Sequence, residues 1–271
     1  MKTILITGAT DGIGKQTALE LASMGHQILL HGRNSDRAER ARDEISHHAG
    51  HQQVSYYLAD LSDFKSIRQM AEQVRQDHDK IDVLLNNAGV LNMDKVILPN
   101  GLEETFMVNH LAHFSLTLQL LPLLKKSQES RIVNVSSQAQ VGTIDFDNLN
   151  GEKYYDGYNA YGVSKLANCL FTYKLSSALK DTPVSVHALH PGVIATKLLH
   201  AGWGGGGAPV ESGAKTTVYA CVSEDLAGKT GLYFVNARPQ RSAAISYDVR
   251  VQDRLWQESL EYASLDDPFR K

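Results

Sequence analysis

The segment "NAYGVSKLAN" (159–168) places a tyrosine and a lysine four residues apart in a helical pattern, so Tyr161 and Lys165 should project from one face of a helix. A free phenol has a pKa near ~10 and is poorly matched to proton transfer at neutral pH. An ammonium beside it favours the phenolate and lowers that pKa. The pair therefore predicts a tuned acid or base. The alternative is a half-buried tyrosine whose neighbouring lysine reaches past it to solvent.

A glycine-rich turn follows the first apolar run of the chain. In "TGATDGIGK", Gly8, Gly12 and Gly14 stand between a strand pattern and a helix pattern, spaced G-x-x-x-G-x-G. Residues without a Cβ let the backbone approach a pyrophosphate, and a helix N-terminus attracts its charge. We expect a dinucleotide-binding turn here, with a plain strand-to-helix turn as the alternative.

The end of the second strand-like run indicates which dinucleotide would bind. A binder of NAD usually carries an acidic residue there, against the ribose 2'-hydroxyl. This chain reads "HGRNSD" instead, with Arg33 and Asn34 in that place. A guanidinium suits a 2'-phosphate through charge-assisted hydrogen bonds. We therefore expect a preference for NADP(H), with NAD(H) also able to bind; the alternative is a solvated loop arginine, with Asp11 and Asp36 adding negative charge nearby.

Short apolar or β-branched runs alternate with helical patterns along the whole chain. The strand-like runs lie at 3–7, 27–32, 54–59, 82–87, 131–136, 184–189 and 231–235. Such alternation is typical of βαβ units with helices on both faces of a parallel sheet. We expect one α/β domain over residues 1–271, a Rossmann-fold doubly wound sheet of about seven strands. Ligands should then sit outside the carboxyl ends of the strands.

Composition excludes several other classes of protein. The 271 residues are 42% hydrophobic and carry a net charge of -3, without a cluster of basic residues, so we expect no nucleic-acid partner. Cys169 and Cys221 are too few for a disulfide framework. Neither a secretory h-region nor a run of 18 apolar residues is present, and we expect a cytoplasmic protein without stable membrane insertion. The histidines follow no metal-ligand spacing, so we expect no metal site.

Four motifs in order give the chain a family resemblance. With "TGATDGIG" (7–14), "NNAG" (86–89), "YGVSK" (161–165) and "PGVIATK" (191–197), it resembles the short-chain dehydrogenase/reductase (SDR) family. The stretch "IDFDNLNGEKYYDGYNAYGVSKLANCLF" is similar to the retinol-dehydrogenase-like branch. The resemblance implies hydride transfer between a nicotinamide and a small-molecule carbonyl or alcohol substrate.

Matched motif by motif, the resemblance implies a catalytic tetrad of Asn109, Ser137, Tyr161 and Lys165. Ser137 is chosen over Ser136 because the second serine of that pair is the catalytic one in the family. The side-chain amide of Asn109 would hold a water that relays protons to Lys165. The implied cofactor contacts are Gly8, Thr10, Asp11, Gly12, Ile13, Gly14, Arg33, Asn34, Asp60, Leu61, Asn87, Ala88, Gly89, Tyr161, Lys165, Pro191, Gly192, Val193 and Thr196.

Other expectations concern the periphery and the competing functions. The resemblance implies that a glycine-rich segment at about 198–214 covers the substrate, with Trp203 as an apolar contact; the alternative is a surface loop without a role in binding. The runs "FSLTLQLLPLL" and "KLANCLFTYKL" are apolar enough to pair subunits into a homodimer or homotetramer. A non-catalytic NADP(H) sensor is the alternative to an enzyme, but it would not need the tetrad. An extended-branch epimerase or dehydratase would show a G-x-x-G-x-x-G turn, which is not found.

Overall fold

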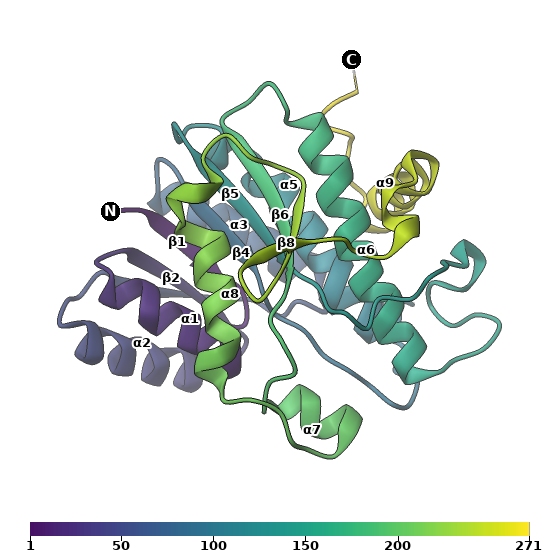
Figure 1. Ribbon diagram of the computed structural model, residues 1–271, viewed down its shortest axis with the longest axis horizontal. Coiled ribbons are helices and arrows are strands. Elements are labelled where there is room, and N and C mark those ends of the chain that lie inside the picture. Colours follow the sequence, from purple (N-terminus) through teal and green to yellow (C-terminus); the bar gives the residue numbers. More distant parts are fainter. Residues whose placement is uncertain (271) are drawn as a thin grey trace.

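The computed structural model describes residues 1–270, which form one eight-stranded sheet between helices (Figure 1). The strand order is β3-β2-β1-β4-β5-β6-β7-β8, and all neighbours are parallel except β7 and β8. The doubly wound α/β fold is therefore confirmed. The strands are β1 (Thr3–Ile6), β2 (Gln27–Gly32), β3 (Val54–Leu58), β4 (Val83–Asn86), β5 (Ser130–Val135), β6 (Val184–His190), β7 (Leu232–Val235) and β8 (Arg238–Gln240).

The eighth strand is an addition to the seven that the sequence pattern predicts. β8 is a three-residue antiparallel edge strand that contains Pro239, and all three of its residues are exposed. A run this short has no readable alternation, and proline is tolerated in a sheet mainly at an edge.

Both faces of the sheet are covered by helices, and consecutive strand residues alternate between the two. Ile4 and Ile6 pack with α1 (Gly12–Ser23), α2 (Ser35–Ala49) and α8 (Val210–Val222), whereas Leu5 faces α3 (Phe64–Asp77), α5 (Ala112–Leu124) and α6 (Gly157–Ala178). Burial on both faces explains the continuous apolar runs of the strands. Among residues 1–270, no helix is both long and apolar enough to cross a membrane.

The helix that carries Asn109 is not regular. It consists of α4 (Glu104–Phe106), a π-helical turn (Met107–Leu111) and α5. The Glu103 carboxylate caps its start by accepting hydrogen bonds from the backbone N–H groups of Thr105 and Phe106, at 2.9 and 2.8 Å. Such π turns insert one residue into a helix and are frequent at functional sites. Asn109 lies inside this turn.

The segment expected as a loop before α8 contains a short helix, α7 (Lys197–Trp203). The Thr196 hydroxyl caps it by accepting from the Leu199 N–H at 3.3 Å, and Gly204 ends it in the left-handed conformation, with φ at +74°. The capping residue and the terminating glycine explain why seven residues form a helix beside a glycine run.

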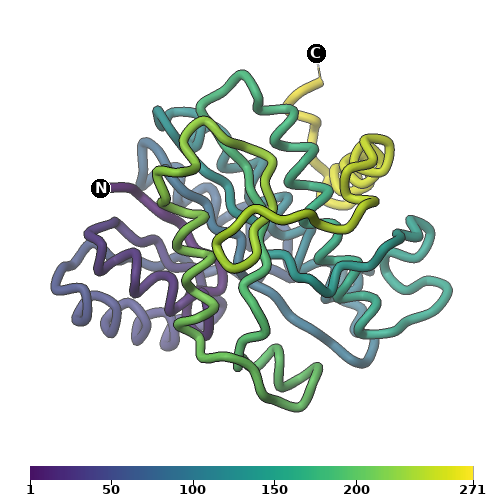
Figure 2. The backbone as a smooth tube through the Cα atoms, in the orientation of Figure 1, coloured from purple at the N-terminus to yellow at the C-terminus, as the bar shows by residue number. Residues whose placement is uncertain are grey.

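The C-terminal helix α9 (Val249–Ala263) lies against α6 (Figures 1 and 2). Trp256 is 2% exposed, and its ring centre lies 5.0 Å from that of Phe114 on α5 and 6.2 Å from that of Phe171 on α6. The chain itself therefore covers part of the apolar α5 and α6 surface that the sequence offered for subunit pairing. The remaining short helical turns span Phe146–Asn148, Glu224–Leu226 and Ala244–Tyr247.

Candidate active site

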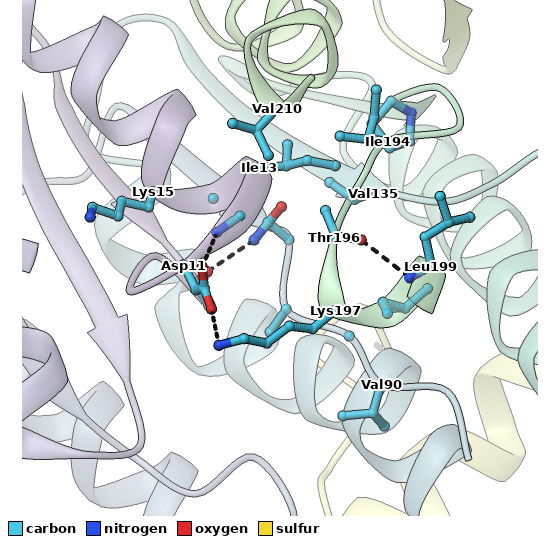
Figure 3. Close-up of a pocket in the computed structure, with 18 of the residues that line it drawn as sticks. Asp11, Ile13, Lys15, Val90, Val135, Ile194, Thr196, Lys197, Leu199 and Val210 are labelled. Atoms are coloured by element: carbon cyan, nitrogen blue, oxygen red, sulfur yellow. Dashed lines mark hydrogen bonds and ion pairs between the residues drawn. The ribbon is translucent and has the colours of Figure 1, made fainter. Parts of the chain in front are cut away.

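A pocket of about 1180 Å³ opens at the carboxyl ends of the strands, as the fold predicts (Figure 3). The glycine turn, the segments after β2 to β6 and helix α7 line it. All nineteen residues implied as cofactor contacts are among its lining residues, and so is Ser137. Asn109 is not among them.

The glycine turn packs directly against the segment after β4. Gly8 has φ at +64°, and a Cβ there would come within 2.9 Å of the Ala88 Cα. The Thr7 hydroxyl oxygen accepts hydrogen bonds from the N–H groups of Asn87 and Ala88, at 2.8 and 3.0 Å. At Gly14, a Cβ would lie 2.4 Å from the Gly8 carbonyl oxygen. Only glycine fits these two positions, so the backbone can come close to a ligand at the N-terminus of α1.

A buried histidine that the sequence analysis did not select ties this turn to the sheet. The His31 Nδ1 accepts a hydrogen bond from the Gly8 N–H at 3.1 Å, and its Nε2–H donates to the Ala59 carbonyl at 3.1 Å. Burial lowers the pKa of His31 to about 4, so the ring is neutral and can accept at Nδ1. A histidine within a strand carries no sequence signal for this role.

Charged side chains meet at the mouth of the pocket around Asp11. Its Oδ2 lies 2.6 Å from the Lys197 Nζ (Figure 3). The same oxygen lies 3.1 Å from the Arg37 Nη2. The hydrogen bond from Lys197 is the main cause that holds the pKa of Asp11 below its usual value. Two cations therefore offset the negative charge that the sequence placed against a phosphate. Neither Arg37 nor Lys197 was predicted, although Arg37 lies only four residues beyond Arg33.

The two residues expected at the 2'-phosphate differ in their surroundings. The Arg33 side chain is 72% exposed, and its Nη1 lies 3.9 Å from the Asp60 Oδ2, so the guanidinium is accessible to a ligand. The Asn34 Oδ1 instead accepts the Arg37 N–H at 3.0 Å and caps α2. Asn34 therefore lines the pocket, but its side-chain oxygen is already engaged in capping α2.

Tyr161 and Lys165 both face the pocket from α6, as their spacing predicts. The Lys165 Nζ lies 5.4 Å from the centre of the Tyr161 ring and donates to the Val135 carbonyl at 3.2 Å. Burial raises the pKa of Tyr161 to about 12, opposed by a hydrogen bond with Ser137, and burial lowers the pKa of Lys165 to about 8. The lowering of the Tyr161 pKa predicted from Lys165 is therefore not found here, because burial is the main cause of the shift and Lys165 is not among its causes.

The two adjacent serines after β5 have different partners. The Ser136 hydroxyl donates to the Lys165 carbonyl at 2.7 Å and so holds α6 against the strand. The Ser137 hydroxyl accepts the Ala139 N–H at 3.1 Å, and its interaction with the Tyr161 phenol opposes the rise in the pKa of that phenol. These contacts support the choice of Ser137.

The side chain of Asn109 is fully engaged with protein. Its Oδ1 accepts the Val90 N–H at 2.7 Å, and its Nδ2 donates to the Val90 carbonyl at 2.9 Å and to the Ser164 hydroxyl at 3.0 Å. Both N–H donors are therefore used, and the contacts do not support the predicted water held by this amide. The side chain instead fixes the segment after β4 against α6.

Aromatic rings form the wall beside Tyr161. The Trp203 ring centre lies 6.1 Å from that of Tyr161 and 5.3 Å from that of Tyr158, whose hydroxyl donates to the Gly202 carbonyl. Trp203 is 48% exposed and lines the pocket, so it can contact a bound molecule. His190 also lines the pocket, and its Nδ1 accepts the Gln138 N–H at 3.3 Å.

Comparisons with known proteins identify the family of the chain and its fold. A family model described as short chain dehydrogenase matches residues 2–203. Human retinol dehydrogenase 13 is 41% identical over 284 residues, covering 98% of this chain and 86% of that protein. The crystal structure of an uncharacterized protein from Mycobacterium paratuberculosis has a TM-score of 0.82 at 30% identity, covering 100% of this chain and 96% of the other.

A second solved structure carries a ligand. A short chain dehydrogenase from Shigella flexneri, complexed with NADP, has a TM-score of 0.70 at 25% identity and covers 88% of this chain and 97% of that chain. The family resemblance read from the four motifs, including its retinol-dehydrogenase-like branch, is confirmed by these matches. The chain belongs to the short-chain dehydrogenase family.

Proposed function

We propose that this protein is an NADP(H)-dependent oxidoreductase that transfers a hydride between a nicotinamide and a carbonyl or alcohol substrate. One observation carries the proposal: Tyr161, with Lys165 beside its ring, and Ser137 line the same pocket as the glycine turn. A module that only sensed the cofactor would not require this arrangement.

The cofactor, when bound, supplies or accepts the hydride. In reduction, Tyr161 donates its proton to the carbonyl oxygen, and oxidation of an alcohol is the reverse. A phenol with a pKa of about 12 is protonated at neutral pH and so holds the proton that reduction requires, but a pKa nearer the working pH would make it a stronger acid. The Ser137 hydroxyl can donate a hydrogen bond to the same oxygen as charge develops, a contribution on the order of 100-fold in rate.

The charges at the pocket mouth support the preference for NADP(H). The accessible guanidinium of Arg33 can bind a 2'-phosphate, and Arg37 and Lys197 add positive charge around Asp11. NAD(H) would bind to the same turn without the contribution of the phosphate. The NADP complex of the Shigella flexneri relative agrees with this preference.

The substrate we propose is a carbonyl or alcohol carried on an apolar group. The exposed indole of Trp203, packed on Tyr158 beside Tyr161, supplies an apolar wall. Relatives named retinol dehydrogenases agree with an apolar substrate class.

Cofactor titrations followed by reduced-nicotinamide fluorescence test the proposal. We expect wild type to bind NADPH more tightly than NADH, and Arg33→Ala to lower NADPH affinity toward the NADH value. Turnover of a panel of ketones and aldehydes should then be lost in Tyr161→Phe and kept in Tyr155→Phe, whose hydroxyl bonds the Asn92 carbonyl. Tight NADPH binding without any turnover would favour the sensor, and binding of neither cofactor would contradict both functions.

A further inference from the structure

Asn168 lies three residues beyond Lys165 on α6 and is 1% exposed. Its side-chain amide belongs to the same hydrogen-bond network as the Lys165 ammonium. Its Nδ2 donates to the Val135 carbonyl at 3.2 Å and to the Asn109 carbonyl at 3.0 Å. The Val135 carbonyl is also the acceptor of the Lys165 Nζ, at 3.2 Å. One carbonyl oxygen is therefore shared by the lysine ammonium and the amide of Asn168.

The orientation of this amide is determined by its partners. Two carbonyl oxygens face its Nδ2, so the reversed amide would place its oxygen against both of them. On the other side, the Asn168 Oδ1 lies 3.3 Å from the His110 Nδ1, which must then carry the proton. The His110 Nε2 is left as an acceptor for the Ser259 hydroxyl at 2.9 Å. Burial lowers the pKa of His110 to about 4, so this neutral tautomer is present at neutral pH.

These contacts form a continuous line of hydrogen bonds from the C-terminal helix to the lysine. Ser259 belongs to α9, His110 to the π-helical turn and Asn168 to α6. All three side chains are almost completely buried, where unpaired polar groups are costly and hydrogen-bonded geometry is well defined.

We propose that Asn168 is a positioning residue for Lys165, with its amide oriented by His110 and Ser259. By donating to the Val135 carbonyl, Asn168 leaves the ammonium only part of that oxygen's accepting capacity and so restricts where the ammonium can sit. By binding the Asn109 carbonyl, it fixes α6 against the π-helical turn. The inference rests on the proposed function, in which Lys165 acts beside Tyr161.

A second buried amide provides a matched control. Asn134 is also 1% exposed and faces the same side of the sheet, where its Oδ1 accepts from the Asn86 Nδ2 at 2.8 Å and its Nδ2 donates to the Thr172 hydroxyl at 2.9 Å. It makes no hydrogen bond with Lys165 in the described part of the chain. If Asn168 contributed only to stability, substitutions of Asn168 and of Asn134 would have the same effect on kcat and on the titration of Lys165.

The test compares Asn168→Asp with Asn134→Asp. The carboxylate of Asn168→Asp cannot donate to the two carbonyls and attracts the ammonium away from Val135. We expect kcat for carbonyl reduction to fall on the order of 10- to 100-fold with little change in KM. The titration of the Lys165 ammonium, followed by heteronuclear NMR of labelled lysine and assigned with Lys165→Arg, should move about one unit or more to higher pH. Asn134→Asp should lower thermal stability but leave kcat and this titration unchanged.

A milder substitution covers the case in which Asn168→Asp does not fold. Ser259→Ala releases the His110 tautomer and should lower kcat roughly two- to fivefold, whereas Ser130→Ala, which removes a buried hydroxyl bonded to the Leu124 carbonyl, should not. Equal effects in each variant and its control would overturn the inference. A shifted Lys165 titration in a protein that reduces no carbonyl would support the positioning role and contradict the proposed function instead.

Discussion

The Lys197 Nζ lies 2.6 Å from the Asp11 Oδ2, so the start of α7 contacts the glycine turn across the mouth of the pocket (Figure 3). The backbones of the two segments are also close at the neighbouring residues, because a Cβ at Gly12 would lie 3.6 Å from the Thr196 methyl group. The ion pair between Asp11 and Lys197 therefore joins the two sides of the pocket at its mouth, beside the glycine turn at which a dinucleotide would bind.

Breaking this contact should speed the release of the cofactor. Lys197 is 83% exposed, and an exposed ion pair contributes about 0.2–1 kcal/mol. We expect Lys197→Met to increase the NADPH dissociation rate roughly two- to fivefold in stopped-flow fluorescence. High salt should produce a similar increase in wild type. Lys215→Met, at an exposed position on α8, is the control, and equal rates in the two variants would contradict the prediction.

Alanine at Gly8 should impair both stability and cofactor binding. Gly8 and Gly25 both have positive φ, at +64° and +82°, but only at Gly8 would the added Cβ meet another atom within 4 Å. We expect Gly25→Ala to cost about 1 kcal/mol of unfolding free energy and Gly8→Ala clearly more. Urea unfolding measures this difference, and NADPH titration should show weaker binding for Gly8→Ala alone. Equal losses would mean that the approach of Ala88 is unimportant.

Acid should destabilise the fold through its buried histidines. Burial lowers the pKa of His31 and His110 to about 4 and that of His113 to about 3, against about 6.5 in an unfolded chain. Between these values the unfolded state binds more protons, so stability is full above pH ~6.5 and is lost as the pH falls toward 4. The slope is up to about 1.4 kcal/mol per pH unit for each histidine.

Urea unfolding at several pH values between 7 and 5 checks this expectation. His113→Asn should reduce the slope by one histidine's share, even if the variant is less stable at pH 7. His48→Asn, at an exposed position on α2, should leave the slope unchanged. A slope that is the same in wild type and His113→Asn would show that this ring does not stay neutral.

Truncation of Trp256 should expose how much α9 contributes to stability. The side chain is 2% exposed and packs on Phe114 and Phe171. We expect Trp256→Ala to lower the unfolding free energy by about 3–5 kcal/mol, since the cavity lies between three helices. Trp203→Ala, at a half-exposed position, should cost much less. Calorimetry measures both, and similar melting temperatures would contradict this account of α9.

The sequence predicts the sheet well because its strands are buried on both faces. Runs such as "QILLHG" (27–32) match β2 residue for residue, since continuous apolar character leaves little choice of conformation. Gly8 and Gly14 could be predicted for a different reason: their spacing between a strand and a helix marks a turn in which no other residue fits. A cytoplasmic location and a homodimer or homotetramer stay predictions, and the cover of α9 over α6 narrows the surface open to pairing.

What the sequence did not reveal depends on contacts between distant segments. The ion pair between Asp11 and Lys197 joins residues 186 positions apart, and no local sequence pattern predicts such a contact. The same holds for the direction in which the Tyr161 pKa shifts, because the sequence shows the lysine four residues away but not how deeply the phenol is buried. Asn34 was read as a ligand contact although asparagine before a helix is also a common cap.

The π-helical turn sets the rotational phase of the helix in which it lies. Each residue of an α-helix advances the chain by about 100°, so a turn that holds one extra residue rotates everything on one side of it relative to the other. Asn109 is inside this turn, and its carbonyl meets Asn168 while its side chain meets Val90. Deleting a single residue here would restore a regular helix and turn one of these two groups away from its partner. The orientation of Asn109 therefore depends on the number of residues in this turn. A substitution leaves that number unchanged, so only an insertion or a deletion would alter the rotation.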